Sequence, residues 1–143
     1  MDKKSLRIPI AILIFFIFFV NWAAMKFYWY SALPWFDMPM HFLGGFWVAL
    51  LFAFILLHHW RLPKSTESRE SPPAPKEPFS IYFALQVIGG VLLVGILWEF
   101  FEVSVNNITV KEYFDIADTV SDLIFDLAGS LLALLFLYKK SKL

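Results

Sequence analysis

The sequence contains no cysteine among its 143 residues. This absence excludes disulfide bonds and thiolate chemistry. The formal net charge is zero, with 12 basic and 12 acidic residues, so the chain lacks the positive excess of a nucleic-acid-binding protein. It also contains no phosphate-binding loop, dinucleotide-binding motif or internal repeat. We therefore expect no nucleic-acid partner.

Apolar residues dominate what is present: 59% of the chain is hydrophobic and 20% is aromatic, and the mean hydropathy is +0.67. Such a composition indicates an integral membrane protein. We predict an all-α fold in which residues 1–143 form one transmembrane domain. The four predicted spans cover residues of about 8–25, 36–60, 79–103 and 118–138. Each is long enough to cross about 30 Å of hydrocarbon as a helix.

Basic residues indicate how the spans are oriented. Ten of the 12 lysines and arginines lie in the N-terminus, the proline-, serine- and glutamate-rich loop 61–78 and the C-terminus. Only Lys26 and Lys111 lie in the other two connections. Because positive residues concentrate on the cytoplasmic side, we predict that both termini and loop 61–78 are cytoplasmic. A multi-pass protein of the plasma membrane is the expected result.

Seven ionisable residues recur at helical spacings of three or four within the last three spans. They are Asp37, His41, Glu99, Glu102, Asp118, Asp122 and Asp126. This spacing places the residues of each span on one helix face. The predicted topology then brings all seven to the extracytoplasmic half of the membrane, where no lysine or arginine accompanies them. Four of the six glycines lie beside these residues and favour close packing of the helices.

A charge near the bilayer centre costs roughly 2.5–3.5 kcal/mol, so the carboxylates need a compensating partner. A divalent metal ion or shared protons would supply it, and we favour the metal because one ion satisfies several oxygens at once. Oxygen ligands suit Mg²⁺, Mn²⁺ or Ca²⁺, and a single histidine also permits Zn²⁺ or iron. The expected ligands are the five carboxylates of the third and fourth spans, Glu99, Glu102, Asp118, Asp122 and Asp126. His41 with Asp37 is the expected catalytic acid or base.

Three functions remain open from these residues. The first is a metal-dependent membrane hydrolase or transferase that acts at the outer leaflet on a lipid-linked or phosphorylated substrate. Its expected partners are the membrane lipids and a lipid-linked small-molecule substrate. The second is a divalent-cation or proton-coupled transporter that uses the same carboxylates. The third is a structural module in which the polar cluster only fixes helix packing. The sequence favours the enzyme, because no continuous polar path reaches the cytoplasmic side.

The three acidic motifs also resemble a known family. Asp37-Met-Pro-Met-His41-Phe-Leu-Gly-Gly45, Trp98-Glu-Phe-Phe-Glu102 and Asp118-Thr-Val-Ser-Asp122 are similar to motifs of the YjdF-like bacterial inner-membrane proteins, in the same order. The resemblance covers residues of about 35–130. More distantly, the layout resembles VanZ-like proteins, although Glu102 stands where a glutamine would be expected. The resemblance implies a compact helical membrane fold and a bacterial inner-membrane location, and it implies no particular activity.

Overall fold

The computed structural model describes residues 4–59, 80–109 and 115–142, and every regular element in those ranges is a helix. The helices are α1 (Lys4–Lys26), α2 (Trp29–Ala32), α3 (Asp37–His59), α4 (Ile81–Thr109) and α5 (Ile116–Ser141). All except α2 are long and apolar enough to cross a membrane. The predicted all-α fold with four spans is therefore confirmed. The predicted loop 61–78 lies outside the described residues.

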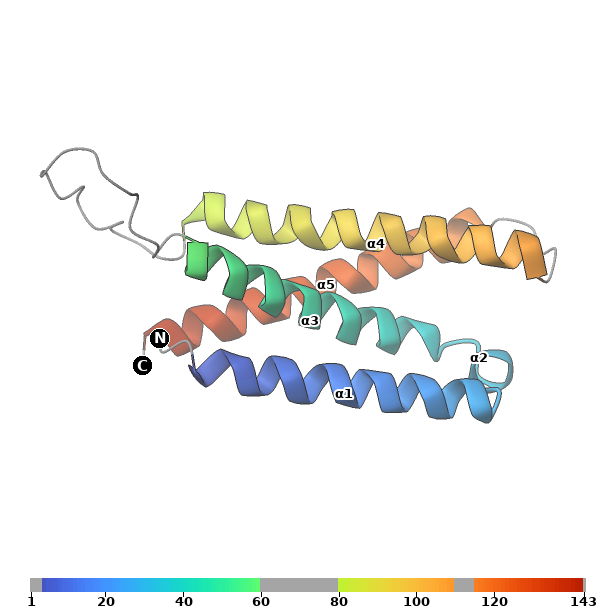
Figure 1. Cartoon of the computed structure of the whole chain (residues 1–143). Coiled ribbons are helices and arrows are strands. Elements are labelled where there is room, and N and C mark those ends of the chain that lie inside the picture. The colour runs from blue at the N-terminus through green and yellow to red at the C-terminus, as the bar shows by residue number, and fades with distance from the viewer. Residues whose placement is uncertain (1–3, 60–79, 110–114, 143) are drawn as a thin grey trace, which may run out of the picture.

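The four long helices form a bundle in which α3 is central. It packs against α1, α4 and α5, and α4 also packs against α5, whereas α1 packs closely only against α3 and the short α2. In Figure 1, α1 begins and α5 ends at the same end of the bundle, and α3 begins at the opposite end. Successive long helices therefore run in opposite directions, as the sequence predicts.

Two glycines bring α3 and α5 into backbone contact. A Cβ atom on Gly45 would collide with the backbone of Asp126. A Cβ atom on Gly129 would collide with the backbone of Phe42. Without a hydrophobic force to join helices inside lipid, close approach of backbones is a main source of packing energy. The expected tight packing beside the acidic residues is confirmed at this pair of helices.

The two ends of the bundle have different interiors. At the end where α3 ends and α4 begins, the core is made of apolar side chains such as Leu50, Phe83 and Leu137. At the other end, the buried side chains include His41 and Asp122. We call these the apolar end and the acidic end of the bundle.

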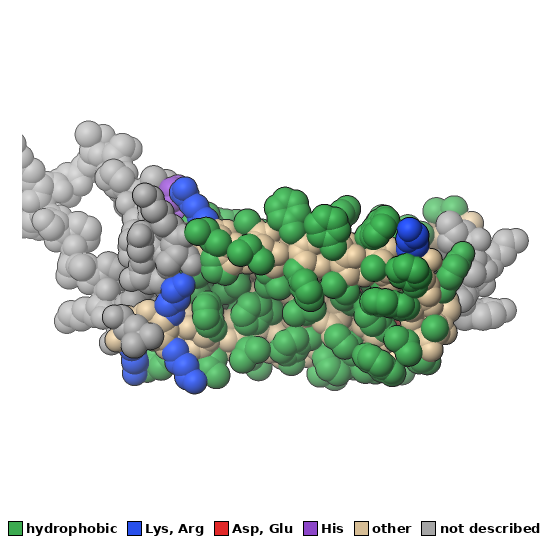
Figure 2. Space-filling model, turned by 90° about the horizontal axis from the view of Figure 1, so that it is seen from below, with side chains coloured by type: hydrophobic (Ala, Val, Ile, Leu, Met, Phe, Trp, Pro, Cys, Tyr) green, Lys and Arg blue, Asp and Glu red, His purple; other side chains and the backbone are tan. Residues whose placement is uncertain are grey.

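Apolar side chains also cover the outside. Figure 2 shows a face on which hydrophobic side chains occupy the middle and lysine and arginine side chains lie toward the ends. On α1, Phe15 and Phe16 are 63% and 53% exposed. Exposed aromatic residues along the whole length of a helix are expected where the surroundings are lipid, as the sequence predicts for the first span.

Two features of the helices differ from the sequence prediction. The one-turn helix α2 was not predicted within the aromatic stretch that follows the first span. Helix α4 continues to Thr109, beyond the predicted end at 103.

Asp115 caps α5, because its side chain accepts a hydrogen bond of 2.8 Å from the backbone N–H of Ala117. The cap fixes where α5 starts and so sets the register of its carboxylates.

Candidate metal-binding site

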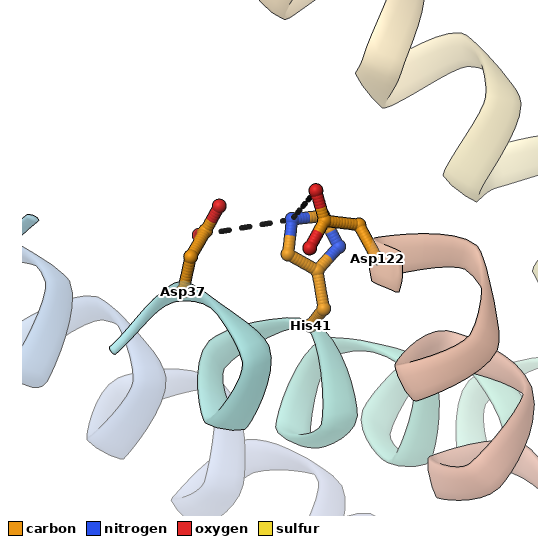
Figure 3. Close-up of side chains that lie close together, drawn as sticks. All are labelled: Asp37, His41 and Asp122. Carbon is orange, nitrogen blue, oxygen red and sulfur yellow. Dashed lines mark ion pairs between the residues drawn. The ribbon is translucent and has the colours of Figure 1, made fainter. Parts of the chain in front are cut away.

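His41 lies at the centre of the acidic end. Asp37 begins α3, and His41 follows one turn later on the same face. The His41 side chain is buried, with 8% of the residue exposed. Figure 3 shows that the imidazole lies between Asp37 of its own helix and Asp122 of α5. The predicted convergence of the two helices on one polar cluster is therefore present.

Both nitrogens of His41 face carboxylates. Nε2 lies 3.7 Å from Oδ1 of Asp37 and 3.9 Å from Oδ2 of Asp122. Nδ1 lies 3.6 Å from Oδ1 of Asp126. These separations are within the range of ion pairs but longer than hydrogen bonds. The two ring nitrogens therefore have different surroundings, with two carboxylates near Nε2 and one near Nδ1.

Helix α4 supplies the other two acids. Ligand atoms of His41, Glu99 and Glu102 all lie within 4.8 Å of one another. Glu99 is buried with 8% exposed, and its Oε1 is the one buried side-chain oxygen or nitrogen in the described residues that has no hydrogen-bond partner. A buried carboxylate oxygen without a partner costs about 1–3 kcal/mol, and more when charged. Oε1 of Glu99 is therefore an oxygen of this cluster that can still accept a partner.

The distances fit a shared cation. Metal–ligand bonds of about 2.1 Å for Zn²⁺ or Mg²⁺ and 2.3–2.6 Å for Ca²⁺ place neighbouring ligands about 3.0–3.7 Å apart and opposite ligands about 4.2–5.2 Å apart. Ligand atoms of Asp37, His41 and Asp122 also lie within 4.8 Å of one another. Both three-residue groups therefore have the spacing and the donor chemistry to hold a divalent ion. His41 belongs to both groups, although the sequence assigned it to catalysis.

Asp118 is the predicted site residue that the structure places apart. It is exposed in the first turn of α5 and belongs to neither group of ligand atoms. Asp126 is buried but faces Nδ1 of His41 instead of joining those two groups. Of the seven predicted residues, five carboxylates therefore converge around the imidazole of the sixth, His41.

The cluster also acts on a neighbouring tyrosine. Tyr30, in α2, donates a hydrogen bond of 2.7 Å from its hydroxyl to Oδ1 of Asn21. Partial burial, followed by the negative charges of Asp37 and Glu102, raises the pKa of Tyr30 to about 12. The phenol therefore stays protonated, and it can donate a hydrogen bond at the edge of the acidic end.

A cavity of about 270 Å³ adjoins the cluster. Asp37, His41 and Asp126 contribute to its lining, and apolar residues of α1, α3 and α4 make up most of the rest. The sequence analysis did not predict this cavity. Its lining residues come from all five helices, and most of them are apolar residues of the kinds found throughout the spans, so no pattern in the sequence marks them.

Four membrane-length helices with a buried histidine and carboxylates at one end define a multi-pass membrane protein with a polar site inside its bundle. Residues 2–142 match the model of the family described as "Predicted membrane protein (DUF2238)". The chain therefore belongs to this family. Searches of curated proteins and of solved structures found no match.

Proposed function

We propose that this protein binds a divalent metal ion through His41, Asp37 and Asp122 and uses it in an enzymatic reaction on a membrane lipid. The single observation that carries the proposal is the buried imidazole, whose Nε2 faces carboxylates from two helices at 3.7 and 3.9 Å. Glu99 and Glu102 approach the same imidazole from α4 and offer further oxygens. The unpartnered Oε1 of Glu99 supports a cation as the missing partner.

Each residue has a distinct part in this proposal. Nε2 of His41 and the carboxylates of Asp37 and Asp122 hold the ion, for which Mg²⁺, Mn²⁺ or Ca²⁺ suits the oxygen-rich set and Zn²⁺ or iron is the alternative. Oδ1 of Asp126 faces Nδ1 at 3.6 Å, and a carboxylate at this position orients the ring, as carboxylates do around metal-bound histidines. When bound, the ion supplies Lewis-acid polarisation of a substrate oxygen.

The interior of the bundle favours an enzyme over a transporter. Within the described residues, the buried polar side chains are His41, Glu99, Asp122, Asp126 and Ser130. All five lie at the acidic end or in the turns next to it, and beyond them the core is apolar. A transporter would need polar groups through the apolar end as well. We accordingly place the reaction at the membrane surface where the acidic end lies.

The orientation and the location are also part of the proposal. Arg7, Lys139 and Lys140 lie at the apolar end, and Lys26 is at the opposite end of α1. The apolar end, which carries most of these basic residues, would face the cytoplasm. The metal site would then face the extracytoplasmic side of a bacterial inner membrane. The resemblance to YjdF-like proteins supports the same location. Reporter fusions after Lys142 should give a cytoplasmic signal. An extracytoplasmic signal would refute this orientation.

The metal is tested by its removal and return. The purified protein should contain a divalent metal by elemental analysis, and excess chelator should lower its melting temperature in detergent. Separate additions of Mg²⁺, Mn²⁺, Ca²⁺ and Zn²⁺ should restore stability with one preferred ion. The His41→Ala variant should hold no metal and should not respond. A protein without metal and with a melting temperature indifferent to every ion would refute the site.

The enzymatic part has its own test. The protein is reconstituted in vesicles of bacterial lipid extract, and the lipids are compared by mass spectrometry over time. A lipid species should be consumed in the presence of the preferred ion and should persist with chelator or with His41→Ala. If metal binds but no lipid changes under any condition, the protein is a metal-binding module and not this enzyme.

A further inference from the structure

Three helices, α1, α3 and α4, supply most of the lining of the cavity beside the candidate metal site, and Tyr30 of α2 and Asp126 of α5 complete it. Ile14 and Ile17 of α1 line one side, Val91 and Val94 of α4 line the other, and α3 lies between them. Helix α1 packs closely against α3 and not against α4. Figure 1 shows α3 between these two helices along most of their length. The cavity is therefore a space over α3 with α1 and α4 as its two walls.

Polar and apolar lining residues are separated along the helix axes. On α1 the lining changes from Asn21 to Ile14, and on α3 it changes from His41 to Val48. Each pair is seven residues apart, which corresponds to roughly 10 Å of helix. Both helices have their polar residue at the acidic end and their apolar residue toward the middle of the bundle. The same direction of change is found in a lipid of one membrane leaflet, from its head group to its chain.

Gly44 keeps the floor of the cavity open. A Cβ atom added to Gly44 would meet nothing within 4 Å, in contrast to its neighbour Gly45, which is pressed against α5. On the α4 wall, Val94 is 38% exposed and Trp98 is 50% exposed, so that wall can be reached from the surrounding membrane. The apolar part of the cavity offers water few polar partners and therefore suits an apolar occupant.

We propose that one hydrocarbon chain of a membrane lipid occupies this cavity, with the lipid's polar part at His41 and Asp37. The proposal deepens the proposed function, on which it rests, by saying where in the bundle each part of the lipid binds. A volume of about 270 Å³ exceeds the roughly 150 Å³ that holds a benzene ring. It is slightly below the about 300–1,000 Å³ of pockets for whole ligands. The cavity therefore fits a segment of one chain and leaves the rest of the lipid in the bilayer.

Two hydrogen bonds fix the cavity at both ends of α1. The indole N–H of Trp47 donates to the backbone oxygen of Ile10 at 2.9 Å, which joins α3 to α1 at the apolar part of the cavity. The Tyr30 hydroxyl donates to Asn21 at the polar part. Between these two points, the α1 wall is made of isoleucine side chains. The wall is thus held in place without closing the space.

The test uses phosphatidylglycerol with a photoactivatable diazirine in one acyl chain, incorporated in vesicles with the full-length protein. After illumination, mass spectrometry measures the label on cavity residues Ile14 and Ile17 and on the exposed neighbours Phe15 and Phe16. Labelling of Ile14 and Ile17 should fall about tenfold in the Gly44→Leu variant, because the added side chain fills the floor. Labelling of Phe15 and Phe16 should not change, because these residues face the bulk lipid.

Gly89→Leu is the matched control. A Cβ atom on Gly89 also meets nothing within 4 Å, and Gly89 lies outside the cavity lining. This variant should keep the labelling of Ile14 and Ile17. Should Gly44→Leu fail to fold, Val48→Trp fills the cavity from the next turn of α3 and should give the same loss. Equal labelling of Ile14 and Ile17 in the wild type and in both cavity-filling variants would overturn the proposal.

Mn²⁺ binding, measured on the same samples, separates this proposal from the metal site. Gly44→Leu should bind Mn²⁺ like the wild type, because Gly44 contributes no ligand. His41→Ala should lose Mn²⁺, and its labelling of Ile14 and Ile17 should fall less than in Gly44→Leu, because the chain lies in the apolar part of the cavity. A wild type that binds no Mn²⁺ would refute the metal site, and the labelling would still decide whether a chain occupies the cavity.

Discussion

The acidic end and the apolar end of this bundle are held together by different kinds of contact. At the apolar end, large side chains such as Leu50, Phe83 and Leu137 fill the space between the helices, and each is less than 2% exposed. At the acidic end, Gly45 and Gly129 remove the side chains so that α3 and α5 meet through their backbones. The helices are therefore in close contact at the apolar end because large side chains fill the space between them. At the acidic end they are in close contact because the glycines have no side chains to hold the backbones apart.

The comparison explains how buried carboxylates are tolerated. Ionisable groups inside a membrane protein cost free energy and do not hold helices together unless they are neutralised. Backbone contact and the apolar core supply the cohesion instead, which leaves the acidic end free to keep its charged residues for binding. On this view, the glycine backbone contact and the apolar core determine stability, and the carboxylates at the acidic end determine ion affinity. Four substitutions test that division.

Gly129→Leu should have the largest effect. Its side chain would collide with the backbone around Phe42, and backbone atoms cannot move aside as a flexible side chain can. We expect a loss of more than about 3 kcal/mol in the free energy of unfolding. Little monodisperse protein should remain after size-exclusion chromatography in detergent. Gly89→Leu is the matched substitution at a glycine in open space, and it should yield folded protein; if Gly129→Leu behaves in the same way, the backbone contact is not essential.

Phe83→Ala should destabilise the apolar end by about 3 kcal/mol, because a fully buried ring loses its packing contacts. Thermal unfolding in detergent should report this as a lower melting temperature. The affinity for Mn²⁺, measured by calorimetry below that temperature, should change less than about twofold, because the candidate metal ligands lie at the other end of the bundle. A drop in Mn²⁺ affinity as large as the drop in stability would show that the two ends are not independent.

Asp122→Asn should have the reverse pattern. Loss of one charged ligand should weaken Mn²⁺ binding about 100-fold, or about 2.7 kcal/mol. Without metal, the variant should be no less stable than the wild type, because Asp122 is 2% exposed and its charge lies near other carboxylates. Calorimetry and unfolding in chelator measure the two quantities. Metal-free protein that unfolds more easily than wild type would indicate that the charge itself stabilises the fold.

Asp118→Asn should have the smallest effect. This residue is exposed and belongs to neither group of candidate ligands, so Mn²⁺ affinity should change less than about twofold. It provides the matched control for Asp122→Asn, since both substitutions remove one carboxylate from the same helix. A loss comparable with that of Asp122→Asn would add Asp118 to the ligands and extend the site to the first turn of α5.

The spans could be predicted from sequence because hydropathy and length are local properties. The second predicted span, about 36–60, agrees closely with α3, Asp37–His59. The helix α2 was missed because its four residues are too few to have a periodic pattern. Helix α4 was predicted too short because the polar residues after 103 suggested a connection, whereas a helix in water beyond the membrane tolerates them.

The residues that gather around His41 could also be predicted, but not their arrangement. A spacing of four indicates a shared helix face, and Asp37 and His41 do lie together. The row 118, 122 and 126 drifts by about 40° at each step, so its two end members point about 80° apart. Which carboxylate faces which nitrogen of His41 depends on the rotation and separation of α3 and α5. Those quantities follow from contacts between distant residues such as Gly129 and Phe42.

The backbone contact between α3 and α5 also has a kinetic consequence. Because Gly45 and Gly129 already bring backbone against backbone, the two helices cannot approach further when a cation neutralises the carboxylates. In the proposed metal site, the opening between Asp37 and Asp122 would accordingly be set before a cation arrives. Exchange should then be limited by how quickly the cation sheds its water and not by a motion of the helices. Since Mg²⁺ dehydrates reluctantly, it should enter and leave far more slowly than Ca²⁺.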